Sequence, residues 1–403
     1  MSLFRGKNVL IGISASIAAY KSVFLVREFI KLGASVRVIM TPESHNFVTP
    51  LTLSTLSNNP VLTSLVKEED EHIWNNHVEL GRWADFMVIA PATSKTISKM
   101  ASGECDNLLL TTYMSAKCPV YFAPAMDLDM LKHASTQQNI QTLKTLGNTY
   151  IPVQEGQLAS GLYGKGRMAE PHDIVDFIHA DFLKKMPLYK KQILVTAGPT
   201  YEPIDSVRFL GNYSSGKMGY AIAKEVADQG ANVVLVSGPT HQTISHANVQ
   251  VLNVTTSDDM FQACVEHFDS CDAAIMCAAV ADYKPTKFHK GKIKKTEGNV
   301  SLNLEKTKDI LHYLGQLKTK QILVGFALEV DNEIANAKQK IKNKQLDFIV
   351  LNSLNDKGAG FKTDTNKISI IDNDNKLHNF ELKSKQDVAK DIINHLTHYL
   401  DGI

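Results

Sequence analysis

Residues 8–21 read NVLIGISASIAAYK, and residues 191–200 read KQILVTAGPT. Each stretch is an apolar strand that runs into a turn of small residues. Small residues after a strand let the backbone approach a phosphate, and the N-terminus of a following helix supplies free N–H groups and positive potential. The chain therefore starts a nucleotide-type α/β unit twice, which predicts two ligand sites on one polypeptide.

Apolar strand-like runs alternate with amphipathic helical stretches on both sides of the basic segment KKMPLYKK (184–191). This βαβ rhythm predicts mostly parallel, doubly wound sheets with sites at the C-terminal ends of the strands. We predict two Rossmann-like α/β domains, residues 1–185 and 190–403. The tail 361–382 alternates polar and apolar residues around a DNDN turn, which predicts a β-hairpin. The other expected strands are 8–14, 35–40, 85–92, 119–125, 193–198, 232–239, 272–283, 321–329 and 347–352.

The composition is that of an ordinary soluble protein. The 403 residues are 44% apolar with a net charge of +1, so no overall field points to nucleic acid or to an acidic membrane surface. No secretory signal or membrane-length apolar run is visible. The five cysteines form no CxxC pair, which disfavours a zinc site or disulfide framework and favours a cytoplasmic protein.

Hydroxyl side chains follow two strands of the first half. Gly12, Ser14 and Ser16 form a turn that lacks the GxGxxG pattern, and APATSKT (90–96) places Thr93 near the start of another helix. Hydroxyls can bond phosphate oxygens directly, which suits a mononucleotide such as FMN at least as well as a dinucleotide. Two such turns at adjacent strand ends would form a phosphate cradle.

Three more segments of the first half could carry chemistry. His77 lies in NNHVELGRWAD, where a lone histidine is more often a surface or capping residue than a catalytic one. APAMDLDM (123–130) ends a strand with Met126 and the carboxylate Asp127. The glycine-rich segment 155–168 is either a surface loop or a lid over a ligand.

Together these segments resemble the flavin-containing phosphopantothenoylcysteine decarboxylase family over residues 7 to about 180. The motifs that carry the resemblance are SIAAYK, the H-x-E-L-x-x-W-A-D block, APAT, DNLL (106–109), PAM and a lid ending in GRM. The resemblance implies a flavodoxin-like fold, a trimer in which a neighbouring subunit supplies the catalytic histidine, and thiol oxidation that lets the adjacent carboxylate leave. The residues it implies for FMN are Gly12, Ser14, Ser16, Thr93 and Met126, with His77, Asp127 and Ser160 as catalytic residues.

Two positions depart from that family. Asp127 stands where the family usually has the Asn that holds the substrate carboxylate, and an ionised Asp would repel that group unless burial kept it protonated. Ser160 stands where the lid usually has a Cys that supplies a proton in the last reduction. In one interpretation, Asp127 has become the proton donor and Ser160 positions the substrate, so that the reaction is complete. In the other, this half stops at the ene-thiol or serves only as a flavin-binding oligomerisation scaffold. We favour the first.

GNYSSGK (211–217) has the spacing of a P-loop, but Met218 follows where a P-loop needs Ser or Thr for magnesium. We reject the P-loop and retain a helix N-terminus suited to an anionic group. Asp282 is expected to close a strand, where it could meet a ribose or metal or merely cap a helix. Residues 284–295 hold six lysines, which form either a solvated loop or a cationic flap over a triphosphate.

The second half resembles phosphopantothenate–cysteine ligase over about residues 190–400. The motifs are TAGPT (196–200), R-F-x-x-N-x-S-S-G-K-M-G (208–219), AAVADY (278–283), KIKK (292–295) and GFALE (325–329). The resemblance implies that CTP with Mg²⁺ activates 4′-phosphopantothenate as an acyl-nucleotide, which L-cysteine then attacks; the metal ligands stay unknown. The implied residues are Asn212 and Arg208 at the reacting groups, with Asp282, Lys292, Asp309, Phe326, Lys340 and Lys344 around the nucleotide.

The two resemblances predict a bifunctional coenzyme A biosynthesis enzyme, whose ligase product phosphopantothenoylcysteine is the substrate of its decarboxylase. Trimeric decarboxylase contacts and dimeric ligase contacts predict a larger closed homo-oligomer such as a dodecamer. Two alternatives stay open at this point: an active ligase whose flavin-binding half is only a scaffold, and a nicotinamide-dependent dehydrogenase.

Overall fold

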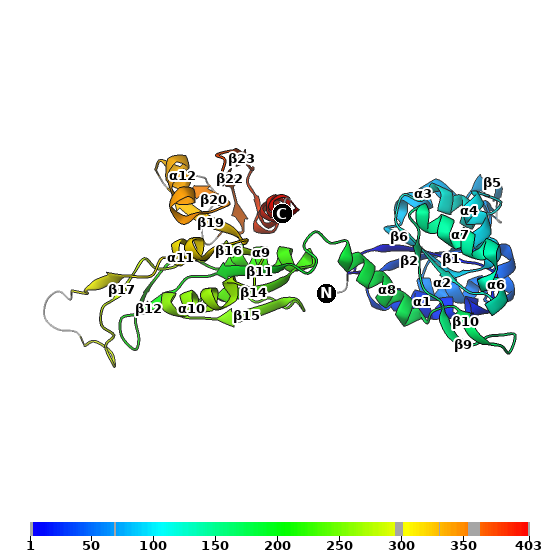
Figure 1. Ribbon diagram of the computed structural model, residues 1–403, viewed down its shortest axis with the longest axis horizontal. Coiled ribbons are helices and arrows are strands. Elements are labelled where there is room, and N and C mark those ends of the chain that lie inside the picture. Colours follow the sequence, from blue (N-terminus) through cyan, green and yellow to red (C-terminus); the bar gives the residue numbers. More distant parts are fainter. Residues whose placement is uncertain (1–2, 68–69, 295–300, 330, 354–362, 402–403) are drawn as a thin grey trace. The chain divides into compact units, whose positions relative to one another are not determined.

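The computed structural model describes residues 3–67, 70–294, 301–329, 331–353 and 363–401 (Figure 1). The chain divides into two compact units, Met1–Phe182 and Leu183–Ile403. Among the described helices, none combines the length and the apolar character needed to cross a membrane. Each unit is built around its own sheet, so each is treated separately below.

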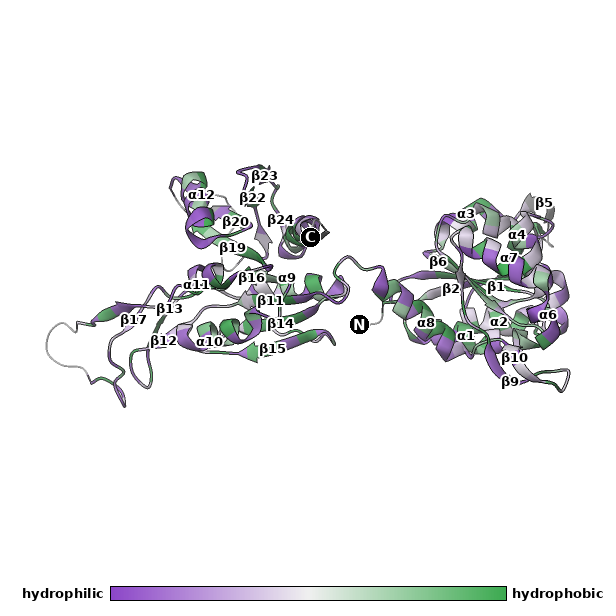
Figure 2. Cartoon of the chain, in the orientation of Figure 1, coloured by the Kyte–Doolittle hydropathy of each residue, from purple (hydrophilic) through white to green (hydrophobic). Residues whose placement is uncertain are grey.

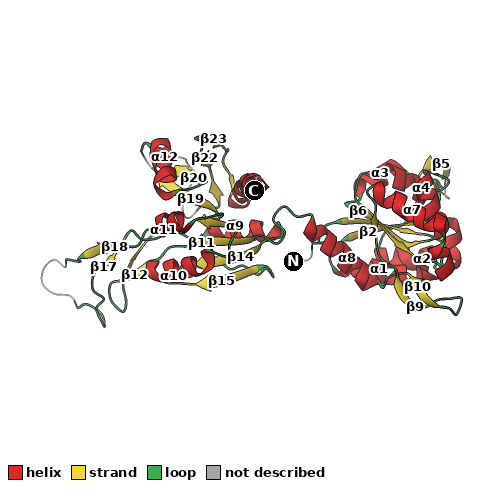
Figure 3. Cartoon of the chain, viewed as in Figure 1, coloured by secondary structure: helices red, strands yellow, loops and turns green. Residues whose placement is uncertain are grey.

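The first unit is a six-stranded sheet in the order β3-β2-β1-β6-β7-β8, and every neighbouring pair of strands is parallel. Successive residues of β1 enter opposite faces: Val9 and Ile11 join one hydrophobic cluster and Leu10 joins another. Because both faces are buried, helices must cover both, as Figure 3 shows. The fold class predicted from the sequence is confirmed.

The elements of the first unit are bounded as follows. The strands are β1 (Asn8–Ile13), β2 (Ser35–Met40), β3 (Val61–Leu62), β4 (Val66–Lys67), β5 (Asp70–Trp74), β6 (Phe86–Ala92), β7 (Val120–Pro124), β8 (Thr149–Tyr150), β9 (Gln154–Gln157) and β10 (Tyr163–Arg167). The helices are η1 (Ile17–Ala19), α1 (Tyr20–Lys31), η2 (Pro42–Asn46), α2 (Pro50–Ser57), α3 (His77–Trp83), α4 (Ser94–Ser102), α5 (Leu108–Ser115), α6 (Leu128–Lys132), α7 (Ala134–Thr145) and α8 (Pro171–Lys184).

The second unit has an eight-stranded sheet in the order β15-β14-β11-β16-β19-β20-β22-β23. It is parallel through β20 and then antiparallel, because β22 and β23 form the hairpin predicted around the DNDN turn. Residues 361–362 of that prediction lie outside the described chain. Along β11, Ile193 and Val195 face one cluster and Leu194 faces the other, so this sheet is doubly wound as well.

The elements of the second unit are bounded as follows. The strands are β11 (Gln192–Ala197), β12 (Tyr201–Pro203), β13 (Phe209–Gly211), β14 (Asn232–Ser237), β15 (Val249–Asn253), β16 (Ala273–Met276), β17 (Tyr283–Pro285), β18 (Leu304–Lys306), β19 (Ile322–Glu329), β20 (Phe348–Ser353), β21 (Thr365–Asn366), β22 (Ile368–Asp372), β23 (Leu377–Asn379) and β24 (Lys383–Ser384). The helices are α9 (Lys217–Asp228), α10 (Ser257–Phe268), α11 (Ile310–Leu317), α12 (Glu333–Lys344) and α13 (Lys385–Asp401).

Short antiparallel pairs lie outside the two main sheets. In the first unit, β9 and β10 form a hairpin that is hydrophilic along its length (Figure 2). In the second unit, the pairs β12–β13 and β17–β18 extend beyond the end of the main sheet (Figure 3). These hairpins carry the predicted lid and two of the predicted ligase motifs.

One strand differs substantially from the sequence prediction, whereas the other predicted strands of the two main sheets agree within two residues at each end. The strand expected over 272–283 ends at Met276, so Asp282 lies in the following loop. The chain leaves the sheet there because Ala278 N–H donates to the Thr196 hydroxyl (3.0 Å) and Ala281 N–H to the Thr200 hydroxyl (3.0 Å).

Candidate functional sites in the two units

The two hydroxyl-bearing turns of the first unit meet at the ends of β1 and β6, which are paired in the sheet. Ser14 is 1% exposed, and its hydroxyl donates to Pro91 O (2.8 Å) and accepts from Thr93 N–H (3.1 Å). Thr93 in turn caps α4 by accepting the Thr96 N–H (3.3 Å). The turns are thus locked to each other by side-chain hydrogen bonds.

These turns line a cavity of about 400 Å³, called the turn cavity below. Its wall includes Ser14, Ser16, Thr93 and Ser94 together with the first residues of α4. Hydroxyl donors beside a helix N-terminus are what a phosphate group requires. This end of the site can therefore hold the phosphate of a mononucleotide.

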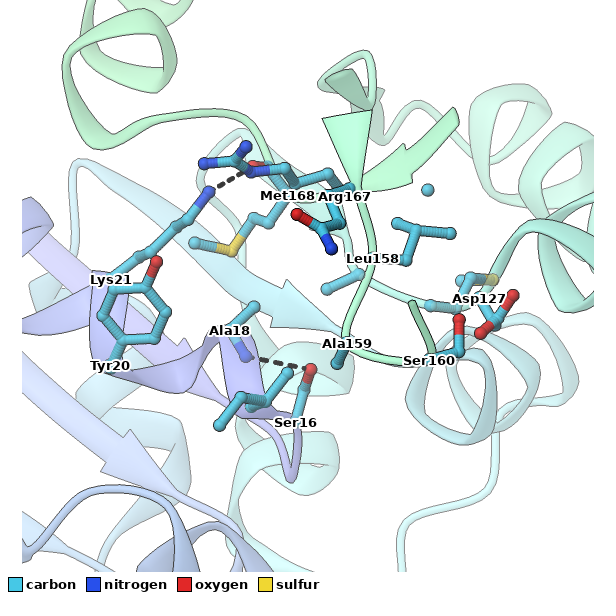
Figure 4. Close-up of a pocket in the computed structure, with 15 residues that line it drawn as sticks. Ser16, Ala18, Tyr20, Lys21, Asp127, Leu158, Ala159, Ser160, Arg167 and Met168 are labelled. Carbon is cyan, nitrogen blue, oxygen red and sulfur yellow. Dashed lines mark hydrogen bonds between the residues drawn. The ribbon is translucent and has the colours of Figure 1, made fainter. Parts of the chain in front are cut away.

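A second cavity, of about 560 Å³, adjoins the turn cavity and shares Ser16, Ala125 and Met126 with it. It is called the lid cavity here, because residues 157–160 and 166–168 of the glycine-rich segment line it. Asp127 and Ser160 lie at one end and Lys21 at the other (Figure 4). The fold therefore brings the two departures from the family pattern into one cavity.

The lid is fastened closely to the segment that carries Asp127. Met126 N–H donates to Gly166 O (3.1 Å), and a Cβ on Gly166 would lie 2.3 Å from Met126 O. Gly166 has φ +153°, a conformation that favours glycine. Asp127 caps the short helix α6 by accepting the Leu128 N–H (2.6 Å). Backbone contact therefore holds the base of the lid against the segment that carries Asp127.

Sequence reasoning missed a buried lysine under the lid. Lys21 is 3% exposed and donates to Met168 O (2.9 Å) and to the Glu170 carboxylate (2.9 Å), which also pairs with Arg167. Burial opposes ionisation of Glu170, but Lys21 and Arg167 outweigh it and hold the pKa of Glu170 below its usual value. The signal that could have found Lys21 is its place at the end of the SIAAYK motif.

Two predicted residues of the first unit are not in these walls. Gly12 contributes to neither described cavity lining; instead, it lies under α5, where an added Cβ would come 2.3 Å from a terminal methyl group of Leu109. His77 begins α3, with its ring 5.2 Å from that of Trp74, and it also lines neither cavity within one chain. Its Nδ1 atom is buried and lacks a hydrogen-bond partner among the described residues.

The second unit has a cavity of about 400 Å³ that we call the Asp309 cavity. Its wall includes Asp282, Asp309, Phe326 and Lys344 of the predicted nucleotide set. Asp309 caps α11 and pairs with Lys344 (2.9 Å). Burial opposes ionisation of Asp309, but the His312 N–H and the Lys344 ammonium outweigh it and lower its pKa. The site therefore places carboxylates, ammonium groups and aromatic rings around a common space.

A neighbouring cavity of about 370 Å³, the Lys217 cavity, shares Ala278, Val280, Asp282 and Phe326 with the Asp309 cavity. Asn212 lies in its wall and donates to Ala279 O (2.9 Å) and Val280 O (3.3 Å). The SSGK segment supplies its cationic and hydroxyl groups at the start of α9: Ser214, Ser215 and Lys217. Two wall residues from the tail, Asn366 and Lys385, were missed by sequence reasoning.

Three predicted cations of the second unit, Arg208, Lys292 and Lys340, are absent from the described linings of both cavities. Arg208 is instead held by Asp205, whose side chain is 0% exposed. That carboxylate accepts Arg208 Nε–H (3.0 Å), Arg208 N–H (2.8 Å) and Ile293 N–H (3.0 Å). The Arg208 guanidinium holds the pKa of Asp205 well below its usual range.

Asp205 therefore ties Arg208 to the residue after Lys292. Arg208 Nη2–H donates to Ile293 O (3.1 Å), and Gly291 N–H donates to the Ser206 hydroxyl (3.0 Å). Arg208 and the backbone on both sides of Lys292 are thus held at one place, near the β12–β13 pair. We call the contacts of Asp205 with Arg208 and with the Ile293 N–H the Asp205 clamp. The i, i+3 spacing of Asp205 and Arg208 is the sequence signal that could have predicted it.

Two doubly wound units, each with a pair of joined cavities at its strand ends, define a two-domain α/β enzyme. The family description "Flavoprotein" matches residues 3–183, and "DNA/pantothenate metabolism flavoprotein C-terminal domain" matches residues 188–400. The chain belongs to the family of coenzyme A biosynthesis bifunctional proteins, which confirms the family predicted from the sequence. It is an enzyme that combines a flavoprotein decarboxylase with a ligase.

Individual relatives cover nearly the whole chain. The coenzyme A biosynthesis bifunctional protein CoaBC of Bacillus subtilis (strain 168) is 40% identical over 393 residues, 97% of each chain. A cysteine/cysteine sulfinic acid decarboxylase of an unknown prokaryotic organism is 53% identical over 351 residues, which are 86% of this chain and 98% of that relative. The crystal structure of the C-terminal domain of a CoaBC protein is 37% identical, with a TM-score of 0.47, and covers 54% of this chain and 100% of that one.

Proposed function

We propose that the second unit ligates 4′-phosphopantothenate to L-cysteine with CTP, and that the first unit decarboxylates the product with FMN. One observation carries the proposal: in each unit, residues far apart in the sequence that bear the family motifs line two joined cavities. Two cavities that share wall residues suit a reaction in which two bound ligands must be in contact.

In the first unit, the turn cavity offers hydroxyls and the N-terminus of α4 to a flavin phosphate. FMN supplies the two-electron acceptor that oxidises the substrate thiol and later returns the electrons to the ene-thiol. Asp127 and Ser160 are the protein's own polar groups at one end of the adjoining lid cavity. Asp127 delivers the last proton to carbon, and Ser160 positions the substrate beneath the lid. His77 acts from a neighbouring subunit of the trimer.

In the second unit, the Asp309 cavity takes the nucleotide and the Lys217 cavity takes the acid. A carboxylate oxygen of phosphopantothenate attacks the α-phosphorus of CTP and expels pyrophosphate. The cysteine amine then attacks the acyl carbon and expels CMP. Asn212, held against the 279–280 carbonyls, orients the acyl group at the junction of the two cavities. Mg²⁺ travels with CTP and neutralises its phosphates.

The test is product analysis on the purified full chain. With phosphopantothenate, cysteine and CTP, we expect CMP, carbon dioxide and 4′-phosphopantetheine, together with a flavin absorbance spectrum. Accumulation of the ene-thiol without phosphopantetheine would show that the first unit is an impaired scaffold. Ligation without any bound flavin would contradict the decarboxylase half of the proposal.

A second candidate for the first unit is decarboxylation of free cysteine or cysteine sulfinic acid. The 53% identical relative that bears this name favours it, since its identity to this chain exceeds that of the CoaBC relative from B. subtilis. Competing carbon dioxide release from the three substrates at equal concentration separates the candidates. Preference for phosphopantothenoylcysteine supports the primary proposal, and preference for free cysteine or its sulfinate supports the second.

A further inference from the structure

Two histidines and an aspartate from three different elements of the second unit meet away from the cavities described above. Asp372 ends β22, His378 lies in β23 and His395 lies in α13. His378 Nε2 lies 2.8 Å from one carboxylate oxygen of Asp372, and His395 Nε2 lies 2.6 Å from the other. None of the three residues lines the Asp309 cavity or the Lys217 cavity. We call these three residues the Asp372 cluster.

The fold builds the Asp372 cluster by placing one face of the β22–β23 hairpin against α13. Ile370 and Asp372 are two residues apart on β22, so their side chains enter the same face of the sheet. His378 is directly opposite Ile370 on β23 and therefore shares that face. Ile370 belongs to the same hydrophobic cluster as Ile392 of α13. The face that carries Asp372 and His378 is thus the face that meets α13, where His395 is located.

The Asp372 cluster is fixed on its inner side and open on its outer side. Asp372 is 7% exposed, and the His395 side chain is 13% exposed. The His395 ring packs edge-on against Phe348 of β20, with ring centroids 4.9 Å apart and an interplanar angle of 83°. The His378 side chain is 39% exposed, so an ion can reach the cluster from water. Two ligand groups are therefore held in place by packing, and the third can adjust.

The charge of Asp372 is balanced in a way that suits a bound cation. A carboxylate this buried needs a cation or hydrogen-bond donors beside it. Within the part of the chain that the structure describes, its ion partners are the two histidines, with no lysine or arginine among them. Neutral imidazole is the commonest metal ligand in proteins. A metal ion held by both rings would supply the positive charge next to the carboxylate.

The distances within the Asp372 cluster fit a small transition-metal ion. Three potential ligand atoms, one from each residue, all lie within 4.8 Å of one another. Zinc binds His nitrogen and carboxylate oxygen at about 2.0–2.2 Å in tetrahedral geometry, which places ligand atoms about 3.3–3.5 Å apart. The two Asp–His separations would have to widen by less than about 1 Å, which the exposed His378 can accommodate. A fourth position stays available for water.

We propose that the Asp372 cluster binds one divalent transition-metal ion of the zinc class, which ties the β22–β23 hairpin to α13. Mixed nitrogen and oxygen ligands select such an ion over Mg²⁺ and Ca²⁺, which prefer oxygen alone. The site is independent of the proposed ligase and decarboxylase functions, because none of its residues is assigned to either. It is also distinct from the Mg²⁺ that accompanies CTP.

The test is zinc binding by the full chain after its metal has been removed with a chelator and the chelator dialysed away. Zinc chloride is titrated calorimetrically into wild type, His378→Gln and His398→Gln. His398 is an exposed histidine on the same helix as His395 and serves as the matched control. Wild type and H398Q should bind one zinc ion per chain more tightly than H378Q, by at least about 100-fold. Loss of a group that only hydrogen-bonds a metal ligand already weakens binding about 10- to 100-fold, and His378 is itself a ligand.

Equal zinc number and affinity in the three proteins would overturn the site. Asp372→Asn is measured in parallel and should show the same loss as H378Q. Circular dichroism checks that each variant folds, and a folded variant of either kind that keeps the wild-type zinc affinity refutes the proposal. Zinc binding should also be unchanged by millimolar Mg²⁺. Displacement of the zinc by Mg²⁺ would show that oxygen ligands elsewhere hold it, and would likewise overturn the site.

Thermal unfolding separates a metal site from a simple hydrogen-bonded network. Zinc well above its Kd should raise the Tm of wild type and H398Q but not that of H378Q, because an ion that binds only the folded chain stabilises it. If H378Q differs from wild type by the same Tm with and without zinc, the Asp372 cluster is only a network of hydrogen bonds and the proposal fails.

Discussion

The flavin site of the first unit and the ligase site of the second hold their polar groups in different ways. In the turn cavity, Ser14 and Thr93 are bonded to each other and to the backbone, so the donors are part of the fold. In the second unit, Asp205 binds the Arg208 guanidinium and the Ile293 N–H away from the described cavity linings. The hydroxyls of the turn cavity are thus fixed by bonds within the fold, whereas two cations predicted for the ligase site, Arg208 and Lys292, lie outside its described linings.

The largest effect is expected where the first unit departs from its family. Asp127→Asn removes the proposed proton donor, so phosphopantetheine formation should fall about 100-fold while the ene-thiol accumulates. Single-turnover product analysis by mass spectrometry measures both species, and ligation serves as the internal control. The double variant Asp127→Asn, Ser160→Cys should regain most of the activity, because it restores the usual carboxamide and thiol. Full activity in Asp127→Asn alone would refute the assigned role.

The next effect concerns the cations outside the ligase cavities. Asp205→Asn should lower ligase kcat about 10- to 100-fold, because the clamp on Arg208 and the Ile293 backbone loses its charge. Decarboxylation by the same protein should be unchanged. Ser206→Ala, which loses only the bond to Gly291 N–H, is the matched control and should stay within about threefold of wild type.

A double-mutant cycle with Arg208→Ala then tests whether Asp205 acts through Arg208. If the two effects do not add, the residues act as one unit. Fully additive effects would show that Asp205 does not act through Arg208.

A smaller effect is expected at the lid. Gly166→Ala forces a Cβ toward Met126 O at a backbone conformation that costs about 1–3 kcal/mol for other residues. We expect weaker flavin retention and roughly tenfold slower decarboxylation, with ligation unaffected. Gly161→Ala is the control, since Gly161 also has a positive φ but no atom within 4 Å of the added Cβ. Equal behaviour of the two variants would show that backbone strain, not the contact with Met126, matters.

The smallest effect is expected in the pH dependence of the stability that the Asp205–Arg208 ion pair contributes. Because Arg208 lowers the pKa of Asp205, the stability that this pair contributes is complete above about pH 4, the usual range of an Asp. It is lost as the pH falls from there toward the lowered pKa of the folded state. Hydrogen-exchange protection of Val207 and Arg208, whose N–H groups donate to Asp205, should therefore decline below about pH 4. The decline should be absent in Asp205→Asn.

Local sequence patterns predicted much of the architecture. The strand at 35–40 was placed at its observed bounds, and the DNDN hairpin was found, because alternation and turn residues act over short distances. The strand at 272–283 was predicted too long. Its second half is as apolar as its first, but long-range bonds to the Thr196 and Thr200 hydroxyls draw it out of the sheet. Nothing within the segment itself signals those partners.

The sequence by itself determined that the chain starts two α/β units. Its motifs pointed to the family, and most of the site residues that they implied line the cavities. Only the tertiary structure decided that Asp127 and Ser160 share one cavity, and that Lys385 from the tail joins Lys217. It also decided that Arg208 lies beside the residue after Lys292. The physical reason is range: propensity and periodicity act over a few residues, whereas these contacts depend on how distant elements pack.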